Sequence, residues 1–239
     1  MKLLKGIKRS LCSLNAFEKA LWISSTIIVL LTFLWGSDRD YIVLCATLVG
    51  VSALIFTAKG NVLGQALVII FSLLYAIVSF KQAYYGEMIS YIFMSGGIAT
   101  MSLISWIKHP FSDGTVKVGH PSAKVLSLVG VLTIVVTVAF YFILDVLGTA
   151  SLLFSTVSIT TSFLASSLVL LRSPYYAIAY TLNDIILIVL WSIASANDPS
   201  AIPMIVCFLV FLVNDIYGFI SWIKREKSQK EALKEPRSS

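Results

Sequence analysis

Two Asn-Asp pairs, Asn183-Asp184 and Asn214-Asp215, are the most polar groups inside the apolar stretches of this chain. Each pair lies near the middle of an apolar run long enough to cross a membrane. A carboxylate near the bilayer centre costs about 2.5–3.5 kcal/mol on insertion scales, so such residues usually face a bundle interior or a water-filled path. Their carboxylate and amide groups can bond hydroxyls. The pairs therefore predict a polar ligand site within the membrane.

Aromatic residues share helix faces with these pairs. Tyr180 and Trp191 lie four residues before and seven after Asp184, which places all three on one face of a helix. Aromatic rings stack on a flat ligand or attract a delocalised cation, so the pattern favours a flat, partly polar molecule. The residues that we expect to contact it are Gln65, Tyr75, Tyr180, Asn183, Asp184, Trp191, Asn214, Asp215 and Tyr217.

A structural interpretation of the same residues stays open. Asn and Asp side chains can hold helices together, at roughly 0.6 kcal/mol per contact. Trp106 and Trp222 each precede a lysine by two residues, which favours an aromatic belt at the membrane interface over a ligand contact. Trp191 fits either a site or a belt. Glu87 is expected at the rim of an outer mouth.

The composition identifies an integral membrane protein. The chain has 239 residues, 58% of them hydrophobic and 13% charged, with a mean hydropathy of +0.90. The net charge of +6 does not indicate nucleic acid, because the basic residues are spread between the apolar runs and the two ends. No P-loop, HExxH, GxSxG or metal-ligand spacing occurs. We therefore expect no catalytic residue, metal or cofactor, while ion coupling through the carboxylates stays open.

Apolar runs of membrane-spanning length occur eight times, which predicts an all-α fold. The predicted spans are 20–36, 41–58, 62–80, 88–107, 124–145, 149–171, 174–196 and 201–223. Residues 1–19 form a basic amphipathic segment suited to an anionic membrane face. Residues 108–123 are expected to form a loop, and the charged tail 224–239 is expected to be disordered.

The positions of lysine and arginine set the orientation. With eight spans, both termini and the loop at 108–123 lie on one side of the membrane. That side carries 16 of the 18 Lys and Arg residues, since only Arg39 and Lys81 lie opposite. The positive-inside rule therefore places both termini in the cytoplasm.

The sequence contains an internal repeat. A shift of 116 residues pairs 49–108 with 165–224 at 13 identities in 60, and both copies end in Ile-Ser-Trp-Ile-Lys. The repeat covers spans 2–4 (41–107) and 6–8 (149–223), with span 5 as a connector and span 1 as an extra N-terminal helix. The connector restores the orientation of the second copy, so the repeats run parallel, an arrangement found in SWEET-type transporters. Such transporters bind substrate near the midplane between the halves.

Several motifs together resemble the PnuC family of nicotinamide riboside transporters. They are the runs Lys-Gly-Asn-Val-Leu-Gly-Gln at 59–65, Tyr-Tyr-Gly-Glu-Met at 84–88 and Asn-Asp-Ile-Tyr-Gly-Phe at 214–219. The resemblance covers about residues 41–224. It implies a SWEET-like homotrimer in a bacterial inner membrane and facilitated diffusion of nicotinamide riboside. Phosphorylation by a cytoplasmic riboside kinase would trap the substrate.

One motif departs from the family pattern. Many PnuC proteins carry Trp-x-x-Trp early in the helix that corresponds to span 7, whereas this chain has Tyr175, Tyr176 and Tyr180 there. A tyrosine can also stack on a pyridinium ring, so Tyr176 joins the expected substrate contacts. Thiamine, riboflavin, deoxynucleosides and a sugar remain alternative substrates. A receptor or scaffold that does not transport is the alternative of a different class.

Overall fold

The structure, a computed structural model, describes residues 10–35, 40–112, 114–196 and 198–234. Eight helical segments in this part of the chain are long and apolar enough to cross a membrane, as predicted. The helices are α2 (Ala16–Trp35), α3 (Tyr41–Ala58), α4 (Val62–Lys81), α5 (Tyr85–Ile89), η1 (Ser90–Gly96), α6 (Gly97–Lys108), α7 (Ala123–Val146), α8 (Leu152–Leu170), α9 (Tyr176–Ser195), η2 (Pro199–Ala201) and α10 (Ile202–Lys234). The segment α5–η1–α6 forms one continuous crossing.

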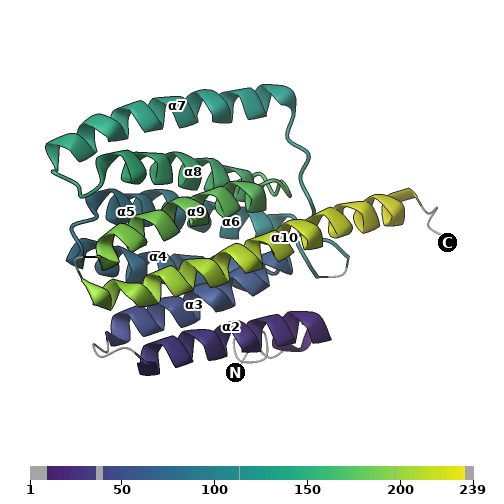
Figure 1. Ribbon diagram of the computed structural model, residues 1–239. Coiled ribbons are helices and arrows are strands. Elements are labelled where there is room, and N and C mark those ends of the chain that lie inside the picture. Colours follow the sequence, from purple (N-terminus) through teal and green to yellow (C-terminus); the bar gives the residue numbers. More distant parts are fainter. Residues whose placement is uncertain (1–9, 36–39, 113, 197, 235–239) are drawn as a thin grey trace.

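Six crossings form a ring made of two three-helix units. The first unit is α3, α4 and α5–α6, and the second is α8, α9 and α10. Helix α3 packs on α10, and α8 packs on α6, so the first helix of each unit contacts the third helix of the other. Helix α7 lies outside the ring against α8, while α2 covers α3 and α10 on the other side (Figure 1). This is the predicted pair of parallel repeats with a connector and an extra helix.

Residues at equivalent positions of the two repeats contact each other in pairs. Three contacting pairs are 116 residues apart, namely Trp106 with Trp222, Tyr75 with Trp191, and Gln82 with Asp198. A residue can meet its own repeat counterpart only at the axis that relates the two copies. The three pairs therefore mark a pseudo-twofold axis that runs along the helices through the ring.

In the first helices of the two repeats, equivalent residues are 112 rather than 116 positions apart. Lys59 and Leu171, 112 residues apart, cap α3 and α8, and the next residues, Gly60 and Arg172, both adopt left-handed backbone angles (φ +65° and +57°). A left-handed conformation is free for glycine and costs roughly 1–2 kcal/mol for arginine. The ungapped comparison at 116 therefore holds for the second and third helices and fails for the first ones.

Two tryptophans at equivalent positions, Trp106 and Trp222, each form a hydrogen bond from one repeat to the other. The indole of Trp222 donates to the carbonyl of Thr57 over 2.9 Å, and the indole of Trp106 donates to the carbonyl of Val169 over 3.2 Å. The two acceptors are themselves 112 residues apart, so the bonds are repeat equivalents. Both indoles are 0% exposed, which corrects the expected aromatic belt. We call Trp106 and Trp222 the tryptophan pair.

The charged tail is helical rather than disordered over its described part. Helix α10 continues to Lys234, well past the membrane-spanning stretch. Gln229 is buried, and its side chain donates to the carbonyl of Val116 and accepts from the N–H of Val118. An ion pair between Glu226 and Lys230, one turn apart, further supports the helix. Residues 1–9 of the predicted amphipathic segment (1–19) and residues 235–239 of the predicted tail (224–239) lie outside the described residues.

We predict that Trp222→Phe weakens the packing of the two repeats. The change removes the indole donor, although Gly60 still donates to the Thr57 carbonyl, and it replaces a fully buried side chain by a smaller one, so the free energy of unfolding should fall by about 1–3 kcal/mol. Denaturant-induced unfolding in detergent measures this loss. Trp35→Phe, at a tryptophan that is 93% exposed, is the matched control and should leave stability within about 0.5 kcal/mol. Equal stability of both variants would contradict the cross-link.

Candidate functional site

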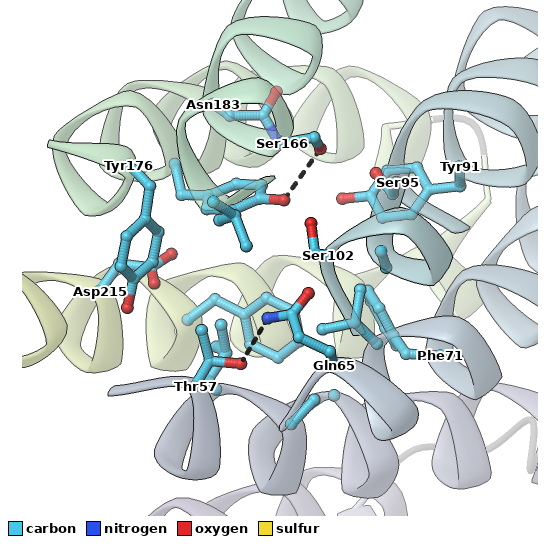
Figure 2. Close-up of a pocket in the computed structure, with 18 of the residues that line it drawn as sticks. Thr57, Gln65, Phe71, Tyr91, Ser95, Ser102, Ser166, Tyr176, Asn183 and Asp215 are labelled. Atoms are coloured by element: carbon cyan, nitrogen blue, oxygen red, sulfur yellow. Dashed lines mark hydrogen bonds between the residues drawn. The ribbon is translucent and has the colours of Figure 1, made fainter. Parts of the chain in front are cut away.

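A cavity lies inside the ring, between the tryptophan pair and the Tyr75–Trp191 contact. Its volume is 50 Å³, so it has room for a few water molecules at about 10–15 Å³ each. Both repeats supply its walls (Figure 2). The residues that line it are Gly50, Ala53, Leu54, Thr57, Gln65, Val68, Phe71, Tyr91, Ser95, Ala99, Ser102, Ser166, Val169, Tyr176, Tyr180, Asn183, Asp184, Phe211 and Asp215.

Two carboxyl groups dominate the chemistry of the cavity. Asp184 on α9 and Asp215 on α10 are each 3% exposed and line the same cavity from two helices that pack on each other. One oxygen of Asp184 has no hydrogen-bond partner. Their repeat counterparts are Val68 and Ala99, which also line the cavity. The second repeat therefore presents two carboxyl groups, which we call the acidic wall, at positions where the first repeat has hydrocarbon side chains.

Aromatic rings surround the acidic wall on both sides of the axis. Tyr176 and Tyr180 come from α9, and the hydroxyl of Tyr180 lies 3.0 Å from that of Ser166. Phe71 and Tyr91 reach the cavity from the first repeat, as Figure 2 shows. A planar ring that enters the cavity would meet aromatic faces together with carboxyl groups, which suits a delocalised cation.

The amides at the cavity wall differ in how firmly they are held. The oxygen of Asn183 accepts hydrogen bonds from three hydroxyl groups of α8, over 2.7–3.2 Å. The donors are Ser158, Thr161 and Ser162. Gln65 has a single long bond, 3.5 Å to the hydroxyl of Thr57. Asn183 therefore holds α9 to α8 as well as lining the cavity, whereas the side chain of Gln65 is held less firmly.

The structure brings six of the ten predicted contact residues to the cavity. They are Gln65, Tyr176, Tyr180, Asn183, Asp184 and Asp215. Tyr75 and Trp191 lie beyond its end, where the indole donates to the phenol oxygen over 2.8 Å. They close the cavity on the side away from the tryptophan pair.

Asn214 and Tyr217 were expected to contact the ligand, but in the structure they bond helix α2 and do not line the cavity. Successive residues of a helix point about 100° apart, so Asn214 faces away from the direction of Asp215. Its amide donates to the hydroxyl of Ser25 on α2 over 3.2 Å, and the hydroxyl of Tyr217 donates to Glu18 on the same helix. In this Asn-Asp pair, Asp215 therefore lines the cavity and Asn214 holds α2.

The sequence analysis missed several cavity residues of the first repeat. Ser95 and Ser102 lie four residues before and three after Ala99, so they share its helix face. Ala99 is the repeat counterpart of Asp215, and this correspondence was the available signal. A short π-helical segment, η1, carries Tyr91 and Ser95, and its last residue, Gly96, would place a Cβ 2.5 Å from the hydroxyl oxygen of Ser72. Glycine thus permits this close approach to α4.

Two parallel three-helix repeats around a buried, partly acidic cavity define a multi-pass membrane transporter of the SWEET-like type. The chain belongs to the nicotinamide mononucleotide transporter family, whose model matches residues 40–224. This family consists of vitamin B3 transporters, not enzymes.

Known relatives agree in sequence and in fold. The nicotinamide riboside transporter PnuC of Neisseria mucosa is 26% identical over 201 residues, which cover 82% of this chain and 76% of that protein. The crystal structure of the vitamin B3 transporter PnuC superposes with a TM-score of 0.83 at 25% identity. This match covers 95% of the present chain and 99% of the other. The resemblance noted from the motifs is thereby confirmed.

We predict that Asn214 and Ser25 are energetically coupled. Alanine at either position removes their hydrogen bond, so a double-mutant cycle of unfolding free energies should give a coupling of about 0.6 kcal/mol. A second cycle between Asn214 and the exposed Ser24 is the control and should give a coupling near zero. Equal coupling in both cycles would show that Asn214 does not hold α2.

Proposed function

We propose that this protein carries nicotinamide riboside across the membrane. The observation that carries the proposal is the acidic wall of Asp184 and Asp215 inside an aromatic cavity on the pseudo-twofold axis. Nicotinamide riboside joins a positively charged pyridinium ring to a ribose that bears hydroxyl groups. Two neighbouring carboxylates repel each other, and a cation between them relieves that repulsion. The named PnuC relative from Neisseria mucosa supports the same substrate.

The charge of the cavity favours a nucleoside over a nucleotide. Among the described residues that line it, none is lysine, arginine or histidine. Phosphate groups are usually recognised by such cations or by helix N-termini. A phosphate beside Asp184 and Asp215 would add repulsion to a buried site. We therefore assign the unphosphorylated riboside, although the family carries the name of the mononucleotide.

Each group in the cavity has a role in this proposal. Tyr176 and Tyr180 stack on the pyridinium ring in place of the absent Trp-x-x-Trp motif. The carboxylates of Asp184 and Asp215 attract its charge and accept hydrogen bonds from ribose hydroxyls. Gln65 bonds the substrate from the first repeat. Recognition is therefore concentrated in α9 and α10, with the first repeat as the opposing wall.

Movement of the repeats would provide the transport step. A cavity of 50 Å³ is too small for a nucleoside, so the walls must separate for the substrate to enter. Rocking of the two three-helix units about the site would open one end at a time. Facilitated diffusion requires no energy source within the chain. Phosphorylation by a cytoplasmic riboside kinase would make the uptake one-way.

The positions of the basic residues support the proposed orientation in the membrane, and the exposed surface of α7 supports the proposed contacts with lipid and other subunits. The end that carries Lys59, Lys117 and Arg172 is assigned to the cytoplasm, with both termini, in a bacterial inner membrane. Helix α7 contacts the bundle mainly through α8 and leaves most of its apolar surface exposed. That surface is available to lipid and to neighbouring subunits of a homotrimer. Light scattering of the purified protein would give the number of subunits.

Thiamine is the second candidate, because it is also a cationic aromatic vitamin. Riboflavin and deoxynucleosides are neutral, so their hydroxyls could bond the acidic wall but they would gain no attraction of charge from it. Uptake of labelled nicotinamide riboside into liposomes that contain the protein, with each of these compounds as competitor, would rank them. If unlabelled thiamine competed more strongly than unlabelled nicotinamide riboside, thiamine would become the assigned substrate. A folded protein that moves none of them would refute transport and favour a receptor or scaffold.

We predict that Asp215→Asn weakens the binding of nicotinamide riboside about tenfold or more. The amide keeps the shape of the side chain but removes a charge that lies in the cavity. Isothermal titration calorimetry would measure the affinity. The dihydro form of the riboside, whose ring is neutral, is the matched control ligand and should bind both proteins within about twofold. An equal loss for both ligands would show that Asp215 supplies hydrogen bonding or packing, not charge recognition.

A further inference from the structure

A third buried carboxyl group, that of Glu87, lies outside the cavity. It belongs to the first turn of α5 and is 0% exposed, which corrects the expected position at an outer rim. Both of its carboxyl oxygens are buried without a hydrogen-bond partner. A carboxylate in such a place is costly unless a positive charge comes close to it. Packing alone therefore gives no reason for an acidic residue at this position.

The surroundings of Glu87 are aromatic. Tyr84 and Tyr91 lie three residues before it and four residues after it in the same crossing and are also buried, and the ring of Tyr91 packs on that of Tyr75. Among the described residues, no lysine, arginine or histidine forms an ion pair with this carboxyl. A carboxyl group framed by aromatic rings is the same combination that the cavity presents at Asp184, Tyr176 and Tyr180.

The contact that closes the cavity separates Glu87 from it. Tyr91 lines the cavity, and its ring packs 4.1 Å from that of Tyr75, behind which Trp191 donates its hydrogen bond. Tyr84 packs edge-on against the same indole. Tyr75, Tyr84 and Trp191 form what we call the aromatic plug. A molecule that passes between the cavity and the end of the bundle at α5 must pass this plug.

A chain of polar groups also links Glu87 to the cavity. Ser158 lies near Glu87, and its hydroxyl donates to the oxygen of Asn183 over 3.2 Å. Asn183 lines the cavity and precedes Asp184 in α9. This hydroxyl is engaged by Asn183, and neither carboxyl oxygen of Glu87 has a hydrogen-bond partner. The polar track thus runs from Glu87 past the plug to the acidic wall.

We propose that Glu87 is a second recognition point for the positively charged ring of the substrate. It receives the ring when the Tyr75–Trp191 contact opens and passes it to Asp184 and Asp215. Intramembrane carboxylates commonly mark the pathways of cations. The repeat counterpart of Glu87 is Pro203, so the chain has this point on one side of the axis alone. The inference rests on the proposed function, since it requires a cationic substrate.

The test compares transport of a charged and an uncharged ring. Liposomes that contain wild type or Glu87→Gln are supplied with nicotinamide riboside or with its neutral dihydro form. We expect the rate of riboside uptake to fall about tenfold in the variant and the rate for the neutral form to change less than twofold. Equilibrium binding of the riboside should stay within about twofold, because Glu87 does not line the cavity. Equal losses for both forms, or no loss for either, would overturn the proposal.

Two further variants test whether the effect comes from the charge of Glu87. Glu87→Asp keeps the charge and should preserve the preference for the charged ring, so a ratio of rates as low as that of Glu87→Gln would also overturn the proposal. Asp145→Asn is the matched control, because Asp145 is an exposed carboxylate at the end of α7 beside the same end of the bundle. It should change neither rate. Failure of the wild-type protein to move the riboside would instead refute the proposed function.

Discussion

The burial of two carboxyl groups in one small cavity is the constraint on which the site depends. Asp184 and Asp215 come from neighbouring helices of one repeat and are each almost fully buried in the wall of this cavity. Packing of α9 on α10 holds them there, and the glue at Asn183 and Asn214 fixes those helices against α8 and α2. The polar residues near the midplane thus fall into two groups, those that hold the helices together and those that line the cavity.

The pseudo-twofold axis explains where the cavity lies. Equivalent residues meet at the axis above and below it, as the tryptophan pair and as the Tyr75–Trp191 contact. Between these contacts, Asp184 and Asp215 face Val68 and Ala99. Both repeats therefore keep large aromatic side chains at the two ends of the cavity, where these side chains close it. The acidic residues lie between the ends, on the wall of the second repeat alone. Symmetry of the fold coexists with asymmetry of the chemistry.

Hydropathy and the repeated Ile-Ser-Trp-Ile-Lys ending were sufficient to predict the eight crossings, the connector and the parallel repeats. They were insufficient at three points. The direction of Asn214 depends on whether α2 or the opposite repeat covers it, which local spacing does not determine. The helix beyond Lys224 depends on the contacts of Gln229 with a loop more than a hundred residues away. The burial of Trp222 depends on a carbonyl of the other repeat.

The parallel arrangement of the repeats has a consequence for how such a site can arise. If a single three-helix unit paired with a copy of itself, every residue at the axis would face an identical residue. A unit that carried Asp184 and Asp215 would then bring four carboxyl groups into one small cavity. Because α7 joins the two units in one polypeptide, each wall can change independently. Fusion of the repeats thus allows an acidic surface to face one without charged groups, which an assembly of identical halves cannot achieve.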